Sequence, residues 1–279
     1  MQTRDPAADP ALAAMAARGY TARPFEAAGL RHTVFSRGQG RPVLLMHELP
    51  GMDGPNVAFA DRLVAAGFAV HLPWLFGPAL RSATLGNYRK LCVSQEFGRL
   101  QAGVTAPVVD WLRALAADLV AARPGQRVGA IGMCLTGSFV IPLILEPGVV
   151  AAVASQPAMP VDGRYLALGW ERDAAWRTQL NVADADLAAA ADVARRDGKH
   201  LLLQHFSADR ACPRERLQRV AEAFGAQAEV HAYQRPGERW RLLRFSPHAL
   251  LTHEYERHGD GDVTRQALAR VIAFLDRHL

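Results

Sequence analysis

Short apolar runs alternate with amphipathic stretches along most of the chain. The apolar runs are β-prone and continuous, as is typical of strands buried on both faces of a parallel sheet, and they occupy residues 42–48, 68–74, 128–131, 149–155, 200–206 and 228–233. The amphipathic stretches repeat apolar residues at helical spacing, and they occupy residues 56–67, 108–122, 185–196, 213–225 and 263–279. This alternation predicts an α/β fold with a mostly parallel, doubly wound sheet flanked by helices.

The less regular segments refine this picture. Residues 1–24 are expected to form an N-terminal arm or short helix, and residues 25–279 a single α/β domain. Segment 31–37 alternates in polarity and runs into the turn-like residues 38–42, which predicts an edge strand and a hairpin. Residues 156–183 could form a small cap.

Composition and charge narrow the class of protein. The chain has 279 residues and a net charge of +5, with basic residues scattered among acids as in 213–224. Because no basic stripe with interleaved aromatic residues occurs, we do not expect nucleic-acid binding. No apolar run reaches spanning length, and residues 1–20 lack the continuous apolar core of a signal peptide. We therefore expect no membrane association, and a homodimer is compatible with the sequence.

The three cysteines indicate the compartment. Cys92, Cys134 and Cys212 are odd in number, and their spacing fits neither disulfides nor a metal site. This usage is typical of a reducing compartment, so a cytoplasmic protein is expected, and no metal or organic cofactor is implied.

One stretch contains the strongest chemical signal. Residues 127–145 read as a strand, a sharp turn at Gly132 and then an apolar helix, with Cys134 at the turn. This arrangement is typical of a nucleophile elbow, in which small residues such as Gly132 and Gly137 let strand and helix close together. A helix N-terminus behind the sulfur would favour a thiolate. The alternative is a buried structural cysteine.

Candidate partners follow later strands. Asp209 lies after the strand at 200–206, and His248 lies before the last helix. The order nucleophile, acid, histidine is that of α/β-hydrolases. Three segments in particular, 44–77, 132–137 and 206–217, together resemble the dienelactone hydrolase family over roughly residues 30–279.

The resemblance implies roles for individual residues. It implies Cys134 as the nucleophile, His248 as its general base and Asp209 as the group that orients the imidazole. Glu48, in the segment 47-HELPG-51, would lie close to the resting thiol and help to convert it to a thiolate. The backbone N–H groups of Leu135 and Leu49 would form the oxyanion hole.

Several of these residues also allow a second interpretation. Asp209 could instead cap a helix, and His253 and His258 compete with His248 for the role of base. A functional role is favoured for Glu48, which lies at the end of a buried strand, because an unpaired buried carboxylate is costly. Arg81 and Arg244 could bind a substrate carboxylate, although a surface role is the simpler interpretation.

The leading hypothesis is a hydrolase of carboxylic esters or lactones that acts through a thioester acyl-enzyme. Two departures from the family pattern motivate an alternative hypothesis, which is a non-catalytic small-molecule binding protein on the same fold. Thr136 stands where the family's elbow has glycine, and residues 234–247 are long and rich in arginine. A redox-sensing cysteine is a third hypothesis, which the absence of a nearby resolving cysteine disfavours.

Overall fold

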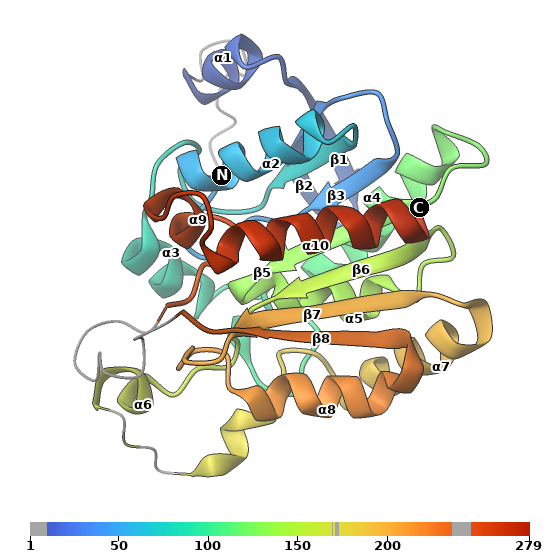
Figure 1. The fold of residues 1–279 in the computed structure, drawn as a ribbon. Helices are drawn as coiled ribbons and strands as arrows, with labels where there is room; N and C mark the ends of the chain where they lie inside the picture. Colours follow the sequence, from blue (N-terminus) through green and yellow to red (C-terminus); the bar gives the residue numbers. More distant parts are fainter. Residues whose placement is uncertain (1–9, 169, 171–172, 236–246) are drawn as a thin grey trace.

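Eight strands form one sheet in the computed structural model of the protein, which describes residues 10–168, 170, 173–235 and 247–279 (Figure 1). The strand order is β1-β2-β4-β3-β5-β6-β7-β8. The strands are β1 Thr21–Ala27, β2 Leu30–Arg37, β3 Pro42–Leu45, β4 Ala69–Trp74, β5 Val128–Met133, β6 Val149–Ser155, β7 His200–Phe206 and β8 Ala228–Tyr233. The pairs from β4 to β8 are parallel, while β1 and β2 are antiparallel to their neighbours. The predicted α/β fold is confirmed.

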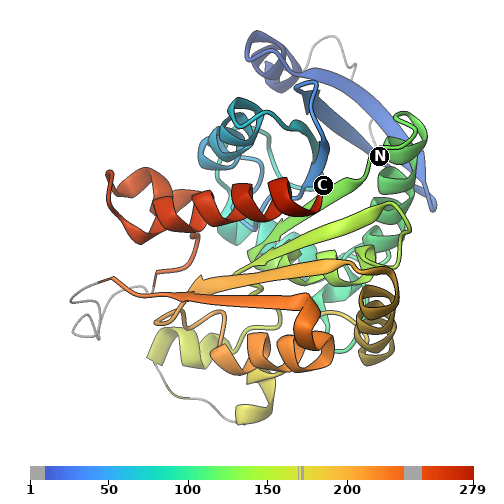
Figure 2. The same cartoon turned by 45° about the vertical axis from the view of Figure 1, so that its right-hand side comes forward.

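Helices cover both faces of the sheet, as the turned view shows (Figure 2). One face carries α1 Pro10–Ala17, α2 Gly54–Ala65, α9 His253–Arg257 and α10 Val263–His278. The other carries α4 Val108–Ala121, α5 Val140–Leu143, α7 Asp184–Asp197 and α8 Arg214–Phe224. Shorter helices are α3 Thr84–Leu91, α6 Gly163–Leu168, η2 Gly98–Leu100, η3 Cys134–Phe139, η4 Ala174–Arg177 and η5 Gly225–Gln227. In the part of the chain that the structure describes, no helix combines the length and the apolar character of a membrane span.

The strand predicted at residues 31–37 is confirmed as β2, but the prediction that it is an edge strand and forms a hairpin through residues 38–42 was wrong. Strand β2 pairs on one side with β1, through a turn at Ala28 and Gly29, and on the other side with β4. The edge is therefore β1, which was not predicted because its alternating residues, 21-TARPFEA-27, include a proline and few apolar side chains. Proline is tolerated in edge strands, where one side of the strand makes no ladder hydrogen bonds.

The topology places two neighbouring loops at the carboxyl edge of the sheet. From β3 the chain continues to β4 on one side, whereas from β5 it continues to β6, β7 and β8 on the other. Strands β3 and β5 are therefore neighbours at the point where the order reverses, and in open α/β sheets the loops at such a point form the crevice that binds ligands. Glu48 follows β3 and Cys134 follows β5.

A buried arginine ties together the loops next to this edge. Arg216, on α8, is 0% exposed. Its guanidinium donates to the backbone carbonyls of Pro157, Pro160, Trp176, Gln179 and Ala211. These five acceptors match the five N–H donors of the side chain. One side chain therefore anchors three segments: the segment that follows β6, the cap-like segment at 174–179 and the loop after Asp209.

The elbow depends on two glycines that allow the backbone to approach closely. A Cβ atom at Gly132 would lie 2.2 Å from the carbonyl oxygen of Thr136, and one at Gly137 would lie 2.7 Å from Cα of Pro157. Both distances are far below van der Waals contact, and the opposing atoms belong to the backbone. Strand β5, η3 and the segment after β6 can therefore pack together only if these side chains are missing.

We predict that Gly132→Ala lowers the free energy of unfolding by at least about 1–3 kcal/mol, the usual cost of overpacking a core. Urea denaturation would measure the change. Gly86→Ala is the matched control, because Gly86 lies within exposed helix α3 and a Cβ there would meet nothing within 4 Å. That variant should be as stable as the parent or up to about 1 kcal/mol more stable. Equal stability of the two variants would contradict the steric argument.

Candidate active site

Cys134 occupies the sharp turn between β5 and η3. Its φ is +53°, a left-handed conformation that is uncommon for a residue with a side chain, and the residue is 7% exposed. The next residue, Leu135, lies in the first turn of η3, so its N–H has no acceptor within the helix. The turn thus presents a thiol and a backbone donor side by side at the carboxyl edge of the sheet.

His248 and Asp209 form a hydrogen-bonded pair at the same edge. Nδ1 of His248 lies 2.7 Å from Oδ2 of Asp209. The other carboxylate oxygen, Oδ1, accepts from the backbone N–H groups of Ala211 and Cys212 at 2.9 and 3.2 Å. Asp209 therefore orders its own loop, as a capping residue would, and still binds the imidazole. Helix α8 begins only after Pro213.

Three chemically different groups meet at the turn. One carboxylate oxygen of Glu48, Sγ of Cys134 and a ring nitrogen of His248 all lie within 4.8 Å of one another. Since Nδ1 of His248 faces Asp209, the buried Nε2 is the nitrogen available to the thiol. The structure thus brings together the thiol, the imidazole and both carboxylates that the sequence singled out.

The charges around His248 change its pKa. Burial alone would lower it, but the nearby Asp209 and Cys134 outweigh burial and raise the pKa of His248 well above its ordinary value. An imidazolium at this position is stabilised by the Asp209 carboxylate that it faces. This is the property that a base needs if it is to keep a thiol proton during a reaction.

Glu48 is a fully enclosed carboxyl group, 1% exposed. Burial raises its pKa, while the Thr252 hydroxyl and the nearby His248 and His253 oppose that shift. Thr252 Oγ1 donates to Oε1, and Nε2 of Gln156 lies 3.5 Å from Oε2. The carboxyl group therefore has a donor at each oxygen, both of them neutral.

The two histidines that competed with His248 in the sequence have other partners. Nε2 of His253 lies 2.9 Å from Oδ2 of Asp53, a carboxylate that also accepts from Ser82 and Asn56. His258 faces Glu254 at 3.3 Å. His47, adjacent to Glu48 in the chain, accepts from Leu75 N and contacts the Glu48 carbonyl, so its ring satisfies backbone groups at the strand end.

Thr136 fits the elbow because its hydroxyl is used. The residue is fully buried, and its Oγ1 accepts from Met133 N at 3.0 Å. The same oxygen lies 3.4 and 3.3 Å from the carbonyl oxygens of Met46 and His47. The hydroxyl thus connects the end of β5 with the chain just after β3, and a threonine is compatible with this turn.

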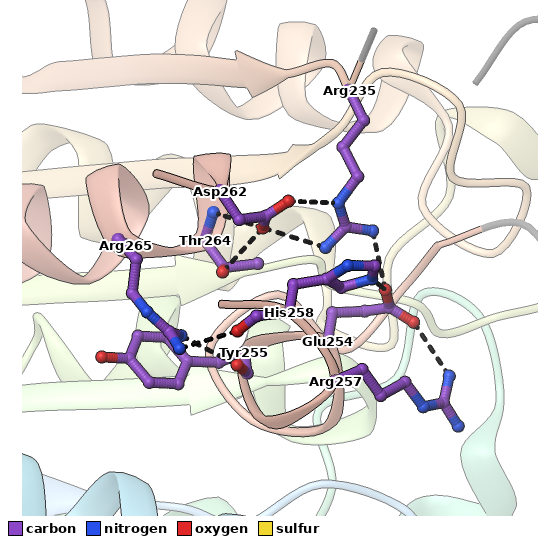
Figure 3. A network of polar contacts seen from close by, with 8 residues as sticks. All are labelled: Arg235, Glu254, Tyr255, Arg257, His258, Asp262, Thr264 and Arg265. Carbon is purple, nitrogen blue, oxygen red and sulfur yellow. Dashed lines mark hydrogen bonds and ion pairs between the residues drawn. The ribbon is translucent and has the colours of Figure 1, made fainter. Parts of the chain in front are cut away.

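The C-terminal segment that contains His248 is anchored by a network of ion pairs (Figure 3). Arg235, just after β8, binds Asp262 through Nε and Nη2 at 2.7 and 3.1 Å, and Glu254 through Nη1 at 2.7 Å. All three side chains are 11–13% exposed. Asp262 is also the N-cap of α10 and accepts from Thr264 N. The network therefore fixes α9 and the start of α10 next to the end of β8.

The remaining predicted residues lie around this cluster. Leu49 lies in the loop after Glu48, partly buried. Arg81 is exposed, and its neighbourhood contacts that loop through Ala83 N, which donates to Pro50 O at 2.9 Å. Arg244 lies outside the described residues, as does most of the 234–247 loop.

The cluster also has the ligand types of a metal site. A thiolate, an imidazole and a carboxylate are donors that zinc accepts, and the second nitrogen of His248 is held by a carboxylate as in many zinc sites. Cys134, His248 and Glu48 could therefore bind such an ion. The chemistry proposed below uses the same groups without one.

Several residues of the site were not predicted from the sequence. Thr252 and the Arg235 network are ordinary polar residues with no motif of their own. Gln156 was a candidate from the sequence, because the segment Gln156–Pro157 directly follows the buried strand 149–155, at the edge where parallel strands place their sites.

Fold and site together define an α/β-hydrolase. A thiol at a strand–helix elbow is followed in chain order by an aspartate and a histidine that pair beside it. The family model of the dienelactone hydrolase family matches residues 31–237, and the chain belongs to this family. The expectation of a carboxylic ester hydrolase of the dienelactone hydrolase type is thereby confirmed.

Solved structures support the same fold. A candidate dienelactone hydrolase from Klebsiella pneumoniae is 17% identical with a TM-score of 0.59, covering 91% of this chain and 98% of its own. An esterase from Pyrococcus furiosus is 15% identical with a TM-score of 0.56, covering 93% and 92%. A dienelactone hydrolase-like promiscuous phosphotriesterase from metagenomic libraries is 16% identical with a TM-score of 0.56, covering 91% and 98%. Among curated proteins, no match was found.

We predict that Asp209→Asn lowers the pKa of His248, because the amide no longer stabilises the imidazolium while its oxygen still orders the loop. NMR titration of the ring protons would measure this, and His253, whose partner is Asp53, is the internal control. An unchanged His248 titration would contradict the pairing.

The same pair should make stability depend on pH. The folded-state pKa of His248 is raised, so its contribution is complete below the unfolded value of about 6.5 and is lost as pH rises through the folded value. The stability difference between the parent and Asp209→Asn should therefore be largest near about pH 6 and shrink in alkaline solution. Chemical denaturation at several pH values would test this.

Proposed function

We propose that this protein hydrolyses carboxylic esters or lactones with a Cys134–His248–Asp209 triad and a thioester acyl-enzyme. The observation that carries the proposal is the position of the His248 ring, with Nδ1 on Asp209 and the other nitrogen beside Cys134 and Glu48. An aspartate on one side of an imidazole and a nucleophile on the other is the arrangement that activates a nucleophile by general-base catalysis.

The first half-reaction forms the thioester. The sulfur of Cys134 attacks the ester carbonyl carbon, and the thiol proton passes to His248 Nε2. Asp209 holds the ring in the tautomer with Nδ1–H and stabilises the imidazolium. Glu48, whose carboxylate belongs to the same cluster, helps the resting thiol to lose its proton when substrate binds.

The negative charge that develops on the carbonyl oxygen needs donors. We assign this role to the backbone N–H groups of Leu135 and Leu49, which lie on the first turn of η3 and in the loop after Glu48. Loss of one such donor in a comparable site costs about 3 kcal/mol of transition-state stabilisation. When the tetrahedral intermediate collapses, the leaving alkoxide takes the proton from His248 and the thioester remains.

The second half-reaction consumes water. His248 removes a proton from a water molecule, which attacks the thioester carbonyl, and the sulfur leaves as the carboxylic acid is released. Activated substrates such as enol lactones and aryl esters suit this chemistry best, because a thiolate attacks them readily and their leaving groups depart easily.

The proposed mechanism fits a reducing compartment. Cys92, Cys134 and Cys212 are all free thiols, and a catalytic thiol is protected from oxidation where thiols are kept reduced. We therefore infer a cytoplasmic enzyme that acts on small molecules without a nucleic-acid partner.

The second candidate function is that of a binding protein that uses the same site without turnover. Thr136 lies where the elbow of the family has glycine, and this departure motivates the alternative. The hydrogen bonds of Thr136 to Met133 and its proximity to the carbonyls after β3 give it a structural role that does not obstruct Cys134. These contacts of Thr136 therefore favour an enzyme over a binding protein.

We predict that Cys134→Ala lowers the hydrolysis rate of p-nitrophenyl acetate by at least about a thousandfold, as expected when a nucleophile is removed. Cys92→Ala is the matched control, since Cys92 is a partly buried thiol outside the cluster, and it should retain the rate of the parent. Unchanged activity of Cys134→Ala would refute the assignment.

Intact-mass spectrometry separates the two functions. Addition of an activated ester should give a transient acyl adduct that peptide mapping assigns to Cys134. Binding of the ester without an adduct, and without turnover, would instead establish the binding protein.

A further inference from the structure

One asparagine is buried on a helix whose other residues are mostly exposed. Of the eight residues of α3, only Asn87 and Leu91 are buried, and Asn87 is 2% exposed. Asparagine is a poor helix former because its side chain competes with the backbone for hydrogen bonds. A buried amide also costs free energy unless it is hydrogen-bonded. Both costs indicate that the side chain of Asn87 has a task outside its own helix.

Two glycines leave the space that the Asn87 amide occupies. A Cβ atom at Gly77 would lie 2.5 Å from Nδ2 and 2.7 Å from Oδ1 of Asn87, and one at Gly51 would lie 3.2 Å from Nδ2. Both glycines have a positive φ, +74° at Gly77 and +107° at Gly51, which residues with a side chain rarely adopt. The loop after β3 and the loop after β4 are thus shaped around this one amide.

The amide of Asn87 binds the loop after β3 through two carbonyls. Nδ2 donates to the carbonyl oxygens of Leu49 and Pro50, each at 3.2 Å. The NH₂ group of an amide has two donors, and this contact uses both. The Pro50 carbonyl also accepts from Ala83 N at 2.9 Å, whereas Asn87 is the only donor to the Leu49 carbonyl within the described residues. The orientation of Leu49 therefore depends on Asn87.

The peptide groups on both sides of Leu49 are held, while its N–H is not used. The Glu48 carbonyl, which shares a peptide group with the Leu49 N–H, accepts from Gly51 N at 2.9 Å. The next peptide group, between Leu49 and Pro50, is held by Asn87. The Leu49 N–H itself donates to no acceptor in the part of the chain that the structure describes. A backbone donor that is fixed in place but unoccupied is suited to an oxyanion hole.

We propose that Asn87 is a positioning residue that orients the Leu49 N–H for the oxyanion hole. It acts through the carbonyls of Leu49 and Pro50. The inference rests on the proposed function, which makes the Leu49 N–H one of the two donors to the oxyanion. It gives helix α3 a role in the active site.

The far end of the same loop has anchors that do not involve Asn87. Leu80 N donates to Met52 O at 2.6 Å, and Ser82 Oγ donates to Oδ2 of Asp53 at 2.6 Å. Substitution of Asn87 therefore leaves the loop attached near residues 52 and 53 and releases the peptide group after Leu49. We expect a local displacement of the donor and not the unfolding of the loop.

The first test measures the first turnover of p-nitrophenyl acetate by stopped-flow absorbance in the parent, Asn87→Ala and Asn87→Asp. Alanine removes both donors, and a carboxyl group donates one hydrogen bond at most. We expect the maximal rate of p-nitrophenolate release to fall about ten- to hundredfold, because a small misplacement of a catalytic donor costs that much. The half-saturating ester concentration should change less than about twofold, since the oxyanion forms only in the transition state.

A second measurement reports on the oxyanion hole itself. In p-nitrophenyl thionobenzoate a sulfur atom replaces the carbonyl oxygen of p-nitrophenyl benzoate, and sulfur is larger and a weaker hydrogen-bond acceptor. Donors that are positioned for oxygen therefore accelerate the oxygen ester more than the thionoester. We expect the ratio of the two acylation rates to fall about tenfold in Asn87→Ala. A smaller fraction of folded protein lowers both rates equally and leaves this ratio unchanged.

Two variants on the same helix serve as matched controls. Leu91→Ala removes the other buried side chain of α3, which belongs to the apolar core, and should lower the denaturation midpoint. Leu85→Ala removes a side chain that is 65% exposed and should be as stable as the parent. Both should keep the parental acylation rate per folded molecule and the parental ratio of oxygen ester to thionoester.

The outcomes separate a positioning role from a structural one. Parental rates in the Asn87 variants would overturn the proposal, and so would a lower rate with an unchanged ratio, as for a protein that is merely less stable. If Asn87→Ala does not fold, Asn87→Asp, which keeps the shape of the side chain, decides.

The same experiment distinguishes this proposal from the proposed function. A parent protein that releases no p-nitrophenolate would overturn the esterase assignment and the role of Asn87 together. Release that is lost in Cys134→Ala but is parental in both rate and ratio in the Asn87 variants would overturn the role of Asn87 alone.

Discussion

The close packing of β5 against η3 is the constraint on which the site depends. No Cβ fits at Gly132 or Gly137, because backbone atoms of Thr136 and Pro157 occupy that space. The chain can make so tight a turn only if the residue between them, Cys134, adopts a left-handed conformation. The thiol is thereby raised above the sheet, and the first free N–H groups of η3 lie beside it.

A second constraint follows from the first. A thiol at this corner lies among groups that are withdrawn from water, and each of them needs a partner from elsewhere in the chain. Asp209 forms a hydrogen bond with the ring of His248. Thr252 and Gln156 donate hydrogen bonds to Glu48. The segment that contains His248 is itself held by Arg235. The two donors to Glu48 lie 204 and 108 positions away from it in sequence, so most of the fold is required before the site exists.

Hydrophobic pattern and motif order were sufficient to predict most of the sheet and of the helices, and to single out the four groups that meet at the turn. Strands such as 149–155 and 200–206 are continuous apolar runs, and a short run of this kind between two amphipathic helices is typical of a strand buried on both faces. Strand β1 was missed because an edge strand does not need an apolar pattern. The place of Gln156 after a strand made it a candidate, but its contact with Glu48 could not have been found in this way. Thr252 meets Glu48 across 204 positions of sequence and Gln156 meets it across 108. Such contacts depend on strand order and register, which the sequence pattern limits but does not determine.

The neutrality of the donors to Glu48 has a chemical consequence. A guanidinium in hydrogen-bond contact would hold the carboxylate firmly ionised, because an opposite charge lowers the pKa of an acid far more than a neutral donor does. A hydroxyl and an amide orient the group but leave burial as the largest influence, so the pKa of Glu48 stays raised. A carboxyl group in this condition can exchange a proton with a neighbouring thiol at modest cost. In the proposed mechanism, substrate that excludes water or brings its carbonyl to the sulfur would then be enough to shift the proton and convert the resting thiol into a nucleophile.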